Sequence, residues 1–430
     1  MRSFLGLAHR WLGLITAAFL FLAGVTGAVI SWDHELDDWL NPHLHEARAP
    51  GPALPVLDLV RLTEQRHPEV RVSFFPLAPE EGESLSLFLT PRVDPTTGKL
   101  FEPHFNQVFL DPATGEELGR REWGAVWPIT KETFVSFLYR LHYTLHLPEM
   151  AGIDRWGIWL MGIIAIGWTL DCFVGFYLTL PARRRRREVD DIGADAPAPS
   201  RSFMQRWAPA WKVRWKGGSA KLNFDLHRAF SLWTWALLFI LAFTAFSLNL
   251  YREVFYPLMS TVSQVTPTPF DKRQPRNKHN PIEPRIDFAE VIRIGRAEGE
   301  RRNWAPLGAV SYADRFGIYQ ARYFHPGDDH GAGGVGPIRL YIDGQTGELL
   351  GERLPWKGTA ADIFVQAQFP LHSGRILGLP GRILISAMGL IVAMLSVTGV
   401  VIWWKKRKAR IKSAARDALR RQEMVASAAK

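Results

Sequence analysis

The sequence from Phe369 to Trp404 reads FPLHSGRILGLPGRILISAMGLIVAMLSVTGVVIWW. It contains a histidine, His372, in a short lead-in, and then runs without a charged residue from Ile383 to its end against the basic run 405–408. A helix of about 22 residues is roughly 33 Å long, enough to cross the hydrocarbon core of a bilayer. The stretch therefore predicts a membrane-spanning helix with a histidine just outside one edge.

The same pattern occurs three more times along the chain. Three further runs of 20 or more residues carry no charged side chain except Asp171, and each has a histidine shortly before it. We therefore predict four transmembrane helices. The further pairs are His9 with residues 11–30, His142 with residues 156–180, and His227 with residues 229–250.

The composition restricts the chemistry that the chain can support. The 430 residues carry a net charge of +10, and the excess lies beside the predicted spans. Membrane phospholipids, rather than nucleic acid, are therefore the expected counter-charge. Cys172 is the only cysteine. This excludes a disulfide within the chain, a cysteine-ligated iron–sulfur cluster and haem attachment through C-x-x-C-H.

Lys and Arg residues are concentrated in segments that fall on one side of a four-span protein. Eleven lie in residues 182–226 and ten in the tail 405–430, while Arg2 and Arg10 precede the first span. Such residues mark the cytoplasmic side of a membrane protein. We therefore expect a multi-pass protein of the bacterial inner membrane, with both termini in the cytoplasm and two large segments in the periplasm.

Three pairs of short motifs recur in the same order, at offsets of 218, 232 and 230 residues. The chain is therefore two copies of a unit that consists of a span, an external domain and a second span. In the first copy a helix-like segment and strand-like segments precede the motif D-x-x-T-G-E, which indicates a small α+β domain. The pairs are His9-Arg10 with His227-Arg228, Asp111–Glu116 with Asp343–Glu348, and Leu141-His142 with Leu371-His372.

The D-x-x-T-G-E turn after a helix and strands resembles a PepSY domain. Flanked by the H-R-W-x-G motif at residues 9–13 and the L-H motifs, the pattern resembles the PepSY-associated transmembrane helix family. That family includes iron-regulated inner-membrane proteins and ferric-siderophore reductases. The resemblance implies a membrane α-helical fold: four transmembrane helices in two span–domain–span repeats, with two periplasmic α+β PepSY-like domains. Gly344 departs from the motif, because proline is usual there.

The predicted domain boundaries follow from this arrangement. The N-terminus and first transmembrane helix cover residues 1–33, and two basic cytoplasmic segments cover 182–226 and 405–430. The other segments are the first PepSY-like domain (34–137), the second transmembrane helix with its periplasmic lead-in (138–181), the third transmembrane helix (227–251), the second PepSY-like domain (252–367), and the fourth transmembrane helix with its lead-in (368–404).

The four histidines fall into two pairs, one at each membrane face. His9 and His227 lie at the cytoplasmic edge, and His142 and His372 lie at the outer edge. Such histidines also hydrogen-bond lipid headgroups or helix ends, but ionisable groups at membrane spans tend to be functional. Two imidazoles from facing helices hold b-type haem without a covalent link. We therefore predict two non-covalent haem b groups with these axial ligands. A closed zinc site is disfavoured, because each pair lacks further ligands.

Other residues near the histidine pairs are candidates for cofactor binding. His146 follows His142 by one helical turn if that segment is helical, and it is the alternative outer ligand. Asp171, the one acid inside a span, either pairs within the bundle or relays protons. Four arginines lie close to the histidines, where a guanidinium suits a haem propionate or a lipid headgroup. They are Arg10, Arg228, Arg140 and Arg375.

Two haems at opposite membrane faces form a path for electrons across the membrane. No flavin or nicotinamide motif is visible, so the expected donor is a membrane quinol or a cytoplasmic reductase. The resemblance implies a ferric-siderophore reductase, which releases iron because hard oxygen donors hold Fe(II) less tightly than Fe(III). The alternatives are a haem electron carrier for another periplasmic acceptor and a non-enzymatic PepSY membrane regulator or binding protein.

Overall fold

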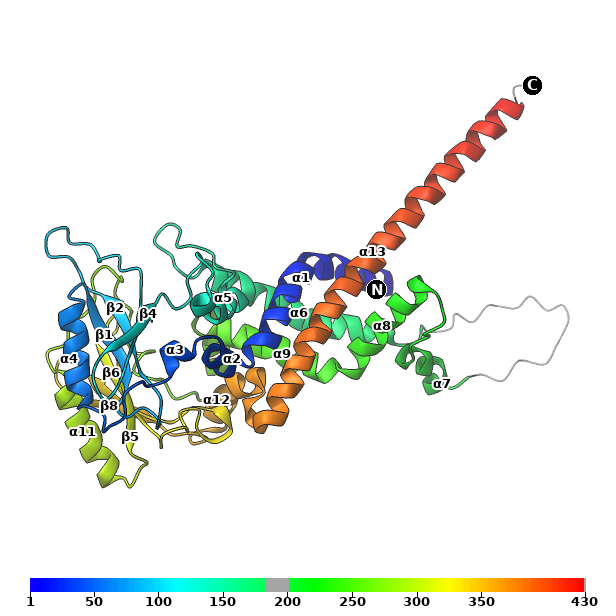
Figure 1. The fold of residues 1–430 in the computed structure, drawn as a ribbon. Helices are drawn as coiled ribbons and strands as arrows, with labels where there is room; N and C mark the ends of the chain where they lie inside the picture. The colour runs from blue at the N-terminus through cyan, green and yellow to red at the C-terminus, as the bar shows by residue number, and fades with distance from the viewer. Residues whose placement is uncertain (183–200, 429–430) are drawn as a thin grey trace. The chain divides into compact units, whose positions relative to one another are not determined.

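The structure is a computed structural model that describes residues 1–182 and 201–428, and the chain forms two compact units (Figure 1). The first, called the membrane unit here, comprises Met1–Ala28, His142–Leu250 and Leu384–Lys430. The second, called the sheet unit, comprises Val29–Leu141 and Tyr251–Ile383. Each unit therefore takes segments from both halves of the chain.

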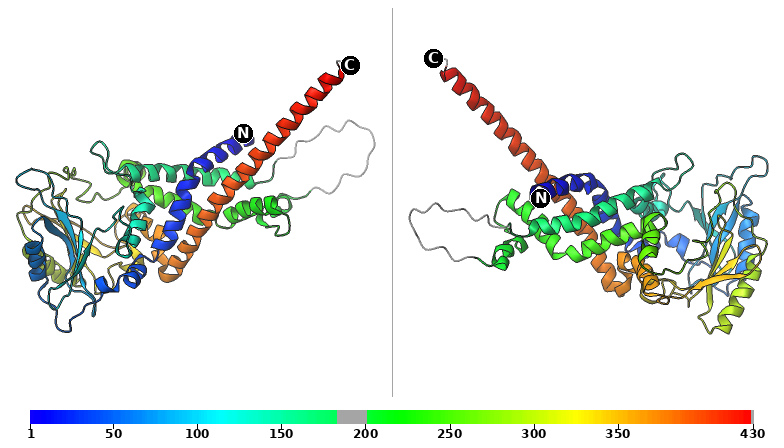
Figure 2. Two further views of the ribbon diagram at one scale, coloured as in Figure 1. Left: turned by 45° about the horizontal axis from the view of Figure 1, so that its top comes forward. Right: turned by 180° about the vertical axis from the view of Figure 1, so that it is seen from behind.

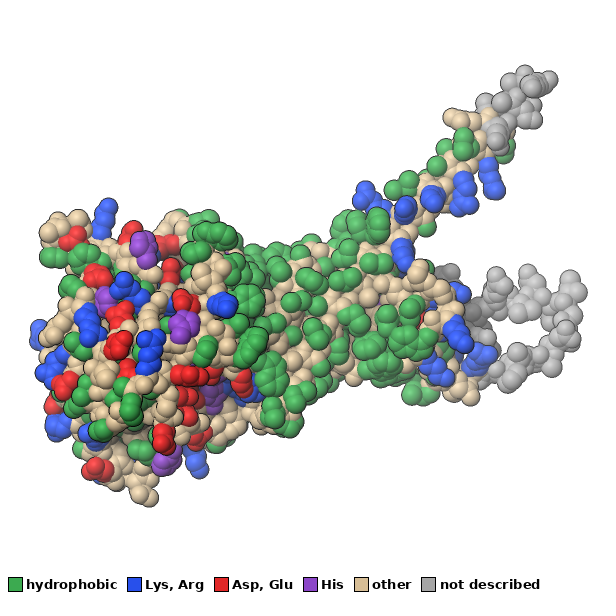
Figure 3. All heavy atoms as spheres, in the orientation of Figure 1, with side chains coloured by type: hydrophobic (Ala, Val, Ile, Leu, Met, Phe, Trp, Pro, Cys, Tyr) green, Lys and Arg blue, Asp and Glu red, His purple; other side chains and the backbone are tan. Residues whose placement is uncertain are grey.

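Long apolar helices form the membrane unit (Figure 2). Among the described residues, three helices are long and apolar enough to cross a membrane, or four if one bent pair is a single span. Figure 3 shows hydrophobic side chains over these helices, with Lys and Arg gathered near α7 and along the C-terminal part of α13. The helices are α1 (Arg2–Ile30), α6 (Trp156–Thr179), α7 (Phe203–Trp207), α8 (Ser219–Trp233), α9 (Trp235–Asn249) and α13 (Gly378–Ala428).

Helices α8 and α9 form the bent pair, where the sequence predicted one span over residues 229–250. The two helices meet at an angle of 73°, and Thr234 between them has φ −108° and ψ 10°, outside the helical region. Its hydroxyl donates to the carbonyl of Phe230 at 2.7 Å, an arrangement that often bends a helix. The 15 residues of α9 reach roughly 22 Å, less than the hydrocarbon core of a bilayer. The third apolar run is therefore interrupted, and any crossing there needs part of α8.

An antiparallel sheet of eight strands forms the centre of the sheet unit. In each half of the chain one helix precedes four strands. The strand order is β4-β3-β2-β1-β5-β6-β7-β8, so the two halves meet at their first strands. The elements of the first half are α4 (Val56–Arg66), β1 (Val70–Pro76), β2 (Leu85–Pro91), β3 (Gln107–Leu110) and β4 (Glu117–Arg121); those of the second are α11 (Phe288–Arg301), β5 (Leu307–Ala313), β6 (Ile318–Tyr323), β7 (Ile338–Asp343) and β8 (Leu349–Arg353).

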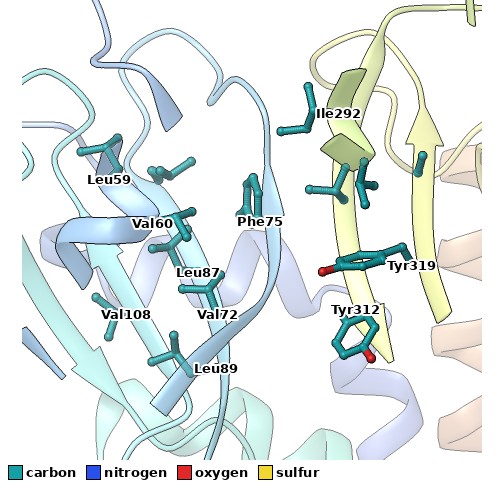
Figure 4. Packing of buried hydrophobic residues seen from close by; sticks show 14 of the residues in the cluster. Leu59, Val60, Val72, Phe75, Leu87, Leu89, Val108, Ile292, Tyr312 and Tyr319 are labelled. Carbon is teal, nitrogen blue, oxygen red and sulfur yellow. The ribbon is translucent and has the colours of Figure 1, made fainter. Parts of the chain in front are cut away.

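Strands β1 and β5 join the halves. They pair in antiparallel register with Phe75 opposite Val310, which satisfies backbone groups that each strand would otherwise present at a free edge. Helices α4 and α11 cover the same face of the sheet (Figure 1). Their side chains, such as Leu59 and Ile292, belong to one buried cluster with the strands (Figure 4). The sequence predicted two α+β domains without showing that they share a sheet and a core.

Short helices complete the sheet unit. Helix α3 packs on β4, where Leu44, Phe109 and Leu118 form a small buried cluster. Asp37 of α2 accepts two hydrogen bonds from Arg121 of β4, at 2.8 and 2.6 Å. This ion pair links α2 to the sheet. The helices are α2 (Asp33–Leu40), α3 (Pro42–His45), α5 (Lys131–Thr144), α10 (Tyr256–Val262) and α12 (Ala360–Ser373).

The first D-x-x-T-G-E motif forms the turn between β3 and β4. Asp111 accepts hydrogen bonds from the backbone N–H groups of Ala113 and Thr114 within the turn, at 3.0 and 3.1 Å. It also accepts the N–H groups of Arg48 and Ala49, each at 2.8 Å. Burial by itself raises the pKa of Asp111, but these donors outweigh it and lower the pKa below its usual value. Asp111 therefore links the segment at Arg48 and Ala49 to the turn between β3 and β4.

We predict that Asp111→Ala lowers the free energy of unfolding by ~2 kcal/mol or more, because several donors lose one charged acceptor together. The folded pKa lies below the unfolded value of about 3.9, so this stabilisation is present at neutral pH and is lost as the pH falls through the folded pKa. Denaturant unfolding of the full chain in detergent, at neutral and acidic pH, measures both effects.

Asp94→Ala is the matched control for this experiment. Asp94 forms a similar turn with Thr96 and Thr97, but its hydrogen bonds are exposed and stay within one loop. We expect a much smaller change in stability. Equal losses of unfolding free energy in the two variants would contradict the proposed stabilising role of Asp111.

Candidate functional site

A cavity of about 570 Å³ lies inside the membrane unit, among α1, α6, α8, α9 and α13. Its volume is in the range of sites for small molecules and cofactors. His9 of α1 and His227 of α8 both line it. Their ring centres are 6.3 Å apart, and the ring planes meet at 59°. The structure thus brings together the two histidines that the sequence predicted as one pair.

Asp171 of α6 holds the ring of His9. The Nδ1 atom of His9 lies 2.8 and 2.9 Å from the two carboxylate oxygens of Asp171. One turn further along α6 stands Gly175, where an added Cβ would lie 3.5 Å from Cε1 of His9. The carboxylate therefore fixes the direction of the imidazole, and the glycine leaves room beside it.

Helix α13 holds the ring of His227 in a similar way. The Nδ1 atom of His227 lies 3.1 Å from the carbonyl oxygen of Leu395 and 3.0 Å from the hydroxyl of Thr398. At Gly399 an added Cβ would lie 3.3 Å from Cε1 of His227, which is tighter than an ordinary contact. The second histidine therefore has neutral partners where the first has a carboxylate.

These contacts leave the other ring nitrogen of each histidine available. A carboxylate and a carbonyl only accept hydrogen bonds, so Nδ1 carries the proton in both His9 and His227 and Nε2 keeps its lone pair. Metal-bound histidines usually donate their other N–H in this manner. The ring centres lie 6.3 Å apart beside one cavity, so the two histidines fit a haem whose iron they would hold through Nε2.

The arginines at this site differ in their partners. Arg10 and Arg228 both line the cavity, and the Nε atom of each is buried without a hydrogen-bond partner among the described residues. However, Arg228 already donates through Nη2 to the carbonyl of Pro209 at 2.7 Å and to Asp225 at 3.0 Å. Arg10 is therefore the better candidate for an anionic group of a ligand, such as a haem propionate.

His142 lies near the end of α5 and contacts α1. Its Nδ1 atom is 3.0 Å from the hydroxyl of Thr26, and this hydroxyl donates to the carbonyl of Leu22 at 2.7 Å. At Gly27 an added Cβ would lie 3.0 Å from Cε1 of His142. His142 therefore resembles His9 and His227: its Nδ1 atom is hydrogen-bonded, and a glycine of another helix lies beside its ring.

His146 does not extend the helix that carries His142. Helix α5 ends at Thr144, and Leu145 and His146 have positive φ angles of 54° and 51°. His142 and His146 would share one helix face only if the segment between them were helical. This condition fails, because the chain leaves the helix before His146.

The remaining predicted residues belong to the sheet unit. His372 lies in the last turn of α12. Arg375 pairs with Asp33 at 3.5 Å, and Arg140 donates to the carbonyl of Gly124 at 3.2 Å. His142 and His372 thus fall in different units, so their pairing at one haem stays a prediction from the repeat.

The sequence model of the PepSY-associated TM region matches residues 7–406. The chain belongs to this family. The match spans both copies of the motifs and confirms the resemblance that the sequence suggested. No curated protein matches the chain.

The sequence offered pairing within the bundle as one of two alternatives for Asp171, and Asp171 does pair, with His9; the specific partners of the histidines in this member of the PepSY-associated family were not predicted. A weak signal for them exists in retrospect: Gly175 and Gly399 each stand four residues after the residue that accepts from the histidine, Asp171 or Leu395. Thr26, the partner of His142, was missed because a threonine inside an apolar run has no distinctive spacing of its own.

For a haem held by the His9–His227 pair, we predict that Gly399→Val weakens binding by roughly 5- to 150-fold, because overpacking costs about 1–3 kcal/mol. The added methyl groups press on Cε1 of His227 and turn the ring. Haem titration of haem-depleted protein, followed by the Soret band, measures the change. Val397→Phe adds volume to α13 at a half-exposed position and is the control. Unchanged affinity in Gly399→Val would contradict the assignment of this cavity.

Proposed function

We propose that this protein is a haem-containing membrane reductase that passes electrons to an external ferric chelate. The observation that carries the proposal is the geometry of the His9–His227 pair. Two imidazoles from different helices line one cavity with ring centres 6.3 Å apart, and the Nδ1 atom of each is hydrogen-bonded. This arrangement is the usual way in which a helix bundle holds b-type haem.

Each residue of the pair has a defined role in the proposal. Haem, when bound, supplies one-electron exchange between its ferric and ferrous states. His9 and His227 would hold its iron through Nε2, Asp171 keeps His9 oriented, and Arg10 would pair with a propionate. The apolar helices exclude water, which favours electron exchange over side reactions of the group.

A second haem near the other membrane face follows from the repeat. His142 and His372 are its proposed ligands. Thr26, which contacts His142, corresponds at the His9–His227 offset to Thr244 of α9. Thr244 also donates its hydroxyl to a carbonyl four residues earlier, that of Ile240, at 2.7 Å. Thr244 therefore repeats in the second copy the hydroxyl-to-carbonyl hydrogen bond that Thr26 makes in the first.

The proposed topology places the first pair on the cytoplasmic side. The basic segments between the second and third spans and after the fourth mark that side, so both termini are cytoplasmic and the sheet unit is periplasmic. The bent α8–α9 pair then counts as the third of four spans in a bacterial inner membrane. Electrons enter from a quinol or a cytoplasmic reductase and leave at the outer haem.

The proposed acceptor is a ferric siderophore in the periplasm. Haem at this face would supply the single electron that reduces Fe(III) to Fe(II), and the ferrous ion would leave the chelate because hard oxygen donors bind it less tightly. No bond of the siderophore has to be broken. The two PepSY-like halves of the sheet unit would then face the compartment in which the chelate arrives.

We predict that His227→Ala removes one of about two haems per chain and blocks reduction of the other from the donor side. The remaining outer haem is still oxidised by external ferric chelate, because a haem at one edge of a core about 30 Å thick cannot contact the opposite face. His372→Ala shows the reverse: the inner haem is reduced and stays reduced when chelate is added. Stopped-flow haem absorbance in oriented vesicles measures both.

His279→Ala is the control for these variants, since His279 lies in an exposed loop of the sheet unit. It retains full haem content and electron transfer. Full haem content in both His227→Ala and His372→Ala would show that the ligand assignment is wrong. A wild-type protein without haem would favour the non-enzymatic regulator.

We predict that Asp171→Asn raises the midpoint potential of the inner haem by roughly 30–60 mV, equivalent to about 0.7–1.4 kcal/mol for one electron. A carboxylate on Nδ1 makes His9 a more electron-rich ligand, which stabilises ferric iron. Thr398→Val, which removes a neutral partner of His227, gives a smaller change. Spectroelectrochemical titration measures both potentials. A shift below about 10 mV in Asp171→Asn would contradict this role.

A further inference from the structure

Three arginines stand in a row across neighbouring strands of the sheet unit. Arg322 of β6 is directly opposite Arg339 of β7, and Arg339 is directly opposite Arg353 of β8. Like charges in such cross-strand positions destabilise a sheet. Arg322 lies over the ring of Phe74 at 5.1 Å, but the repulsion along the row is a cost that a bound anion would offset.

The guanidinium groups of this row lack acidic partners. Among the described residues, no ion pair joins any of the three to a carboxylate, and the Nε atoms of Arg322 and Arg339 are buried without a hydrogen-bond partner. Arg353 donates to the carbonyl of Val335 at 2.9 Å. Burial and the neighbouring charge of Arg339 lower the pKa of Arg322 to about 10. Asp329, the acid whose charge acts on Arg322, is hydrogen-bonded to His330.

The first half of the sheet shows the same positions without this excess of charge. There the row reads Phe88, Gln107 and Arg121, in the same cross-strand register. Arg121 donates to the side-chain oxygen of Gln107 at 2.8 Å and to Asp37 at 2.8 and 2.6 Å. In the first copy the single arginine of the row is therefore paired with a carboxylate of the same copy, whereas the second copy has three arginines in the row.

We propose that the Arg322–Arg339–Arg353 row is a binding site for an anion that carries clustered carboxylate or phosphate oxygens. Guanidinium groups bind such oxygens in pairs of parallel hydrogen bonds. Gly336 lies beside the row, where an added Cβ would be 3.3 Å from Nη2 of Arg339 and 3.8 Å from Nη1 of Arg353, so no side chain there competes with the ligand. The site is independent of haem, and a carboxylate-bearing ferric chelate is one member of the ligand class.

The test uses the full-length protein in neutral detergent, with citrate and inorganic phosphate as soluble probes. Isothermal titration calorimetry is expected to show binding of at least one probe to the wild type, and the probe raises the unfolding temperature. Arg339→Gln introduces the residue that the first half carries at this position. It weakens binding at least tenfold and, without the probe, raises the unfolding temperature because like charges are removed. Arg293→Gln, an exposed position on α11, changes neither quantity.

A second arm identifies the source of the anionic oxygens. Nanodiscs with phosphatidylglycerol are compared with nanodiscs of phosphatidylcholine alone. Stabilisation of the wild type, but not of Arg339→Gln, by phosphatidylglycerol without any effect of citrate or phosphate assigns the row to a lipid headgroup. The proposal is overturned if no anion distinguishes wild type from Arg339→Gln. It is also overturned if Arg339→Gln lowers the unfolding temperature with binding unchanged, because the row would then be structural.

Discussion

Hydrogen bonds to Nδ1 of His9 and His227 are the interactions on which the proposed site depends. Inside an apolar helix bundle a polar ring must find a partner, and the position of that partner decides which nitrogen faces the cavity. Asp171 is costly at a membrane span, and its contact with His9 gives it a hydrogen-bond partner there. Leu395 and Thr398 of α13 are the corresponding hydrogen-bond partners of His227. The cavity between the rings follows from these restraints.

The two copies of the repeat keep the fold and differ in chemistry. Both copies contribute a helix and four strands to one sheet, and both place a histidine against a glycine of a neighbouring helix. The differences lie in single side chains at matching positions. A carboxylate serves His9 but a carbonyl and a hydroxyl serve His227, and Gln107 in one half corresponds to Arg339 in the other. Small local changes in a repeated frame thus create two unlike histidine environments and one cationic row.

The sequence predicted the features that have a local pattern. Apolar runs of sufficient length indicated the spans, and the offset between motifs indicated the pairing of His9 with His227, whose rings lie 6.3 Å apart. Non-local features left no such pattern. The pairing of β1 with β5 joins strands that lie more than 230 residues apart. The bend at Thr234 depends on one hydroxyl, and the exit from the helix before His146 depends on two positive φ angles.

Electron paramagnetic resonance of the oxidised wild-type protein, prepared with and without ¹⁵N-labelled histidine, reports which nitrogens bind the iron. If paired histidines hold haem, the spectrum shows low-spin ferric haem, with two histidine nitrogens bound to each iron and altered hyperfine coupling in the labelled sample. A high-spin signal, coupling to a single histidine nitrogen, or the absence of haem from protein made with adequate iron would contradict ligation by paired histidines.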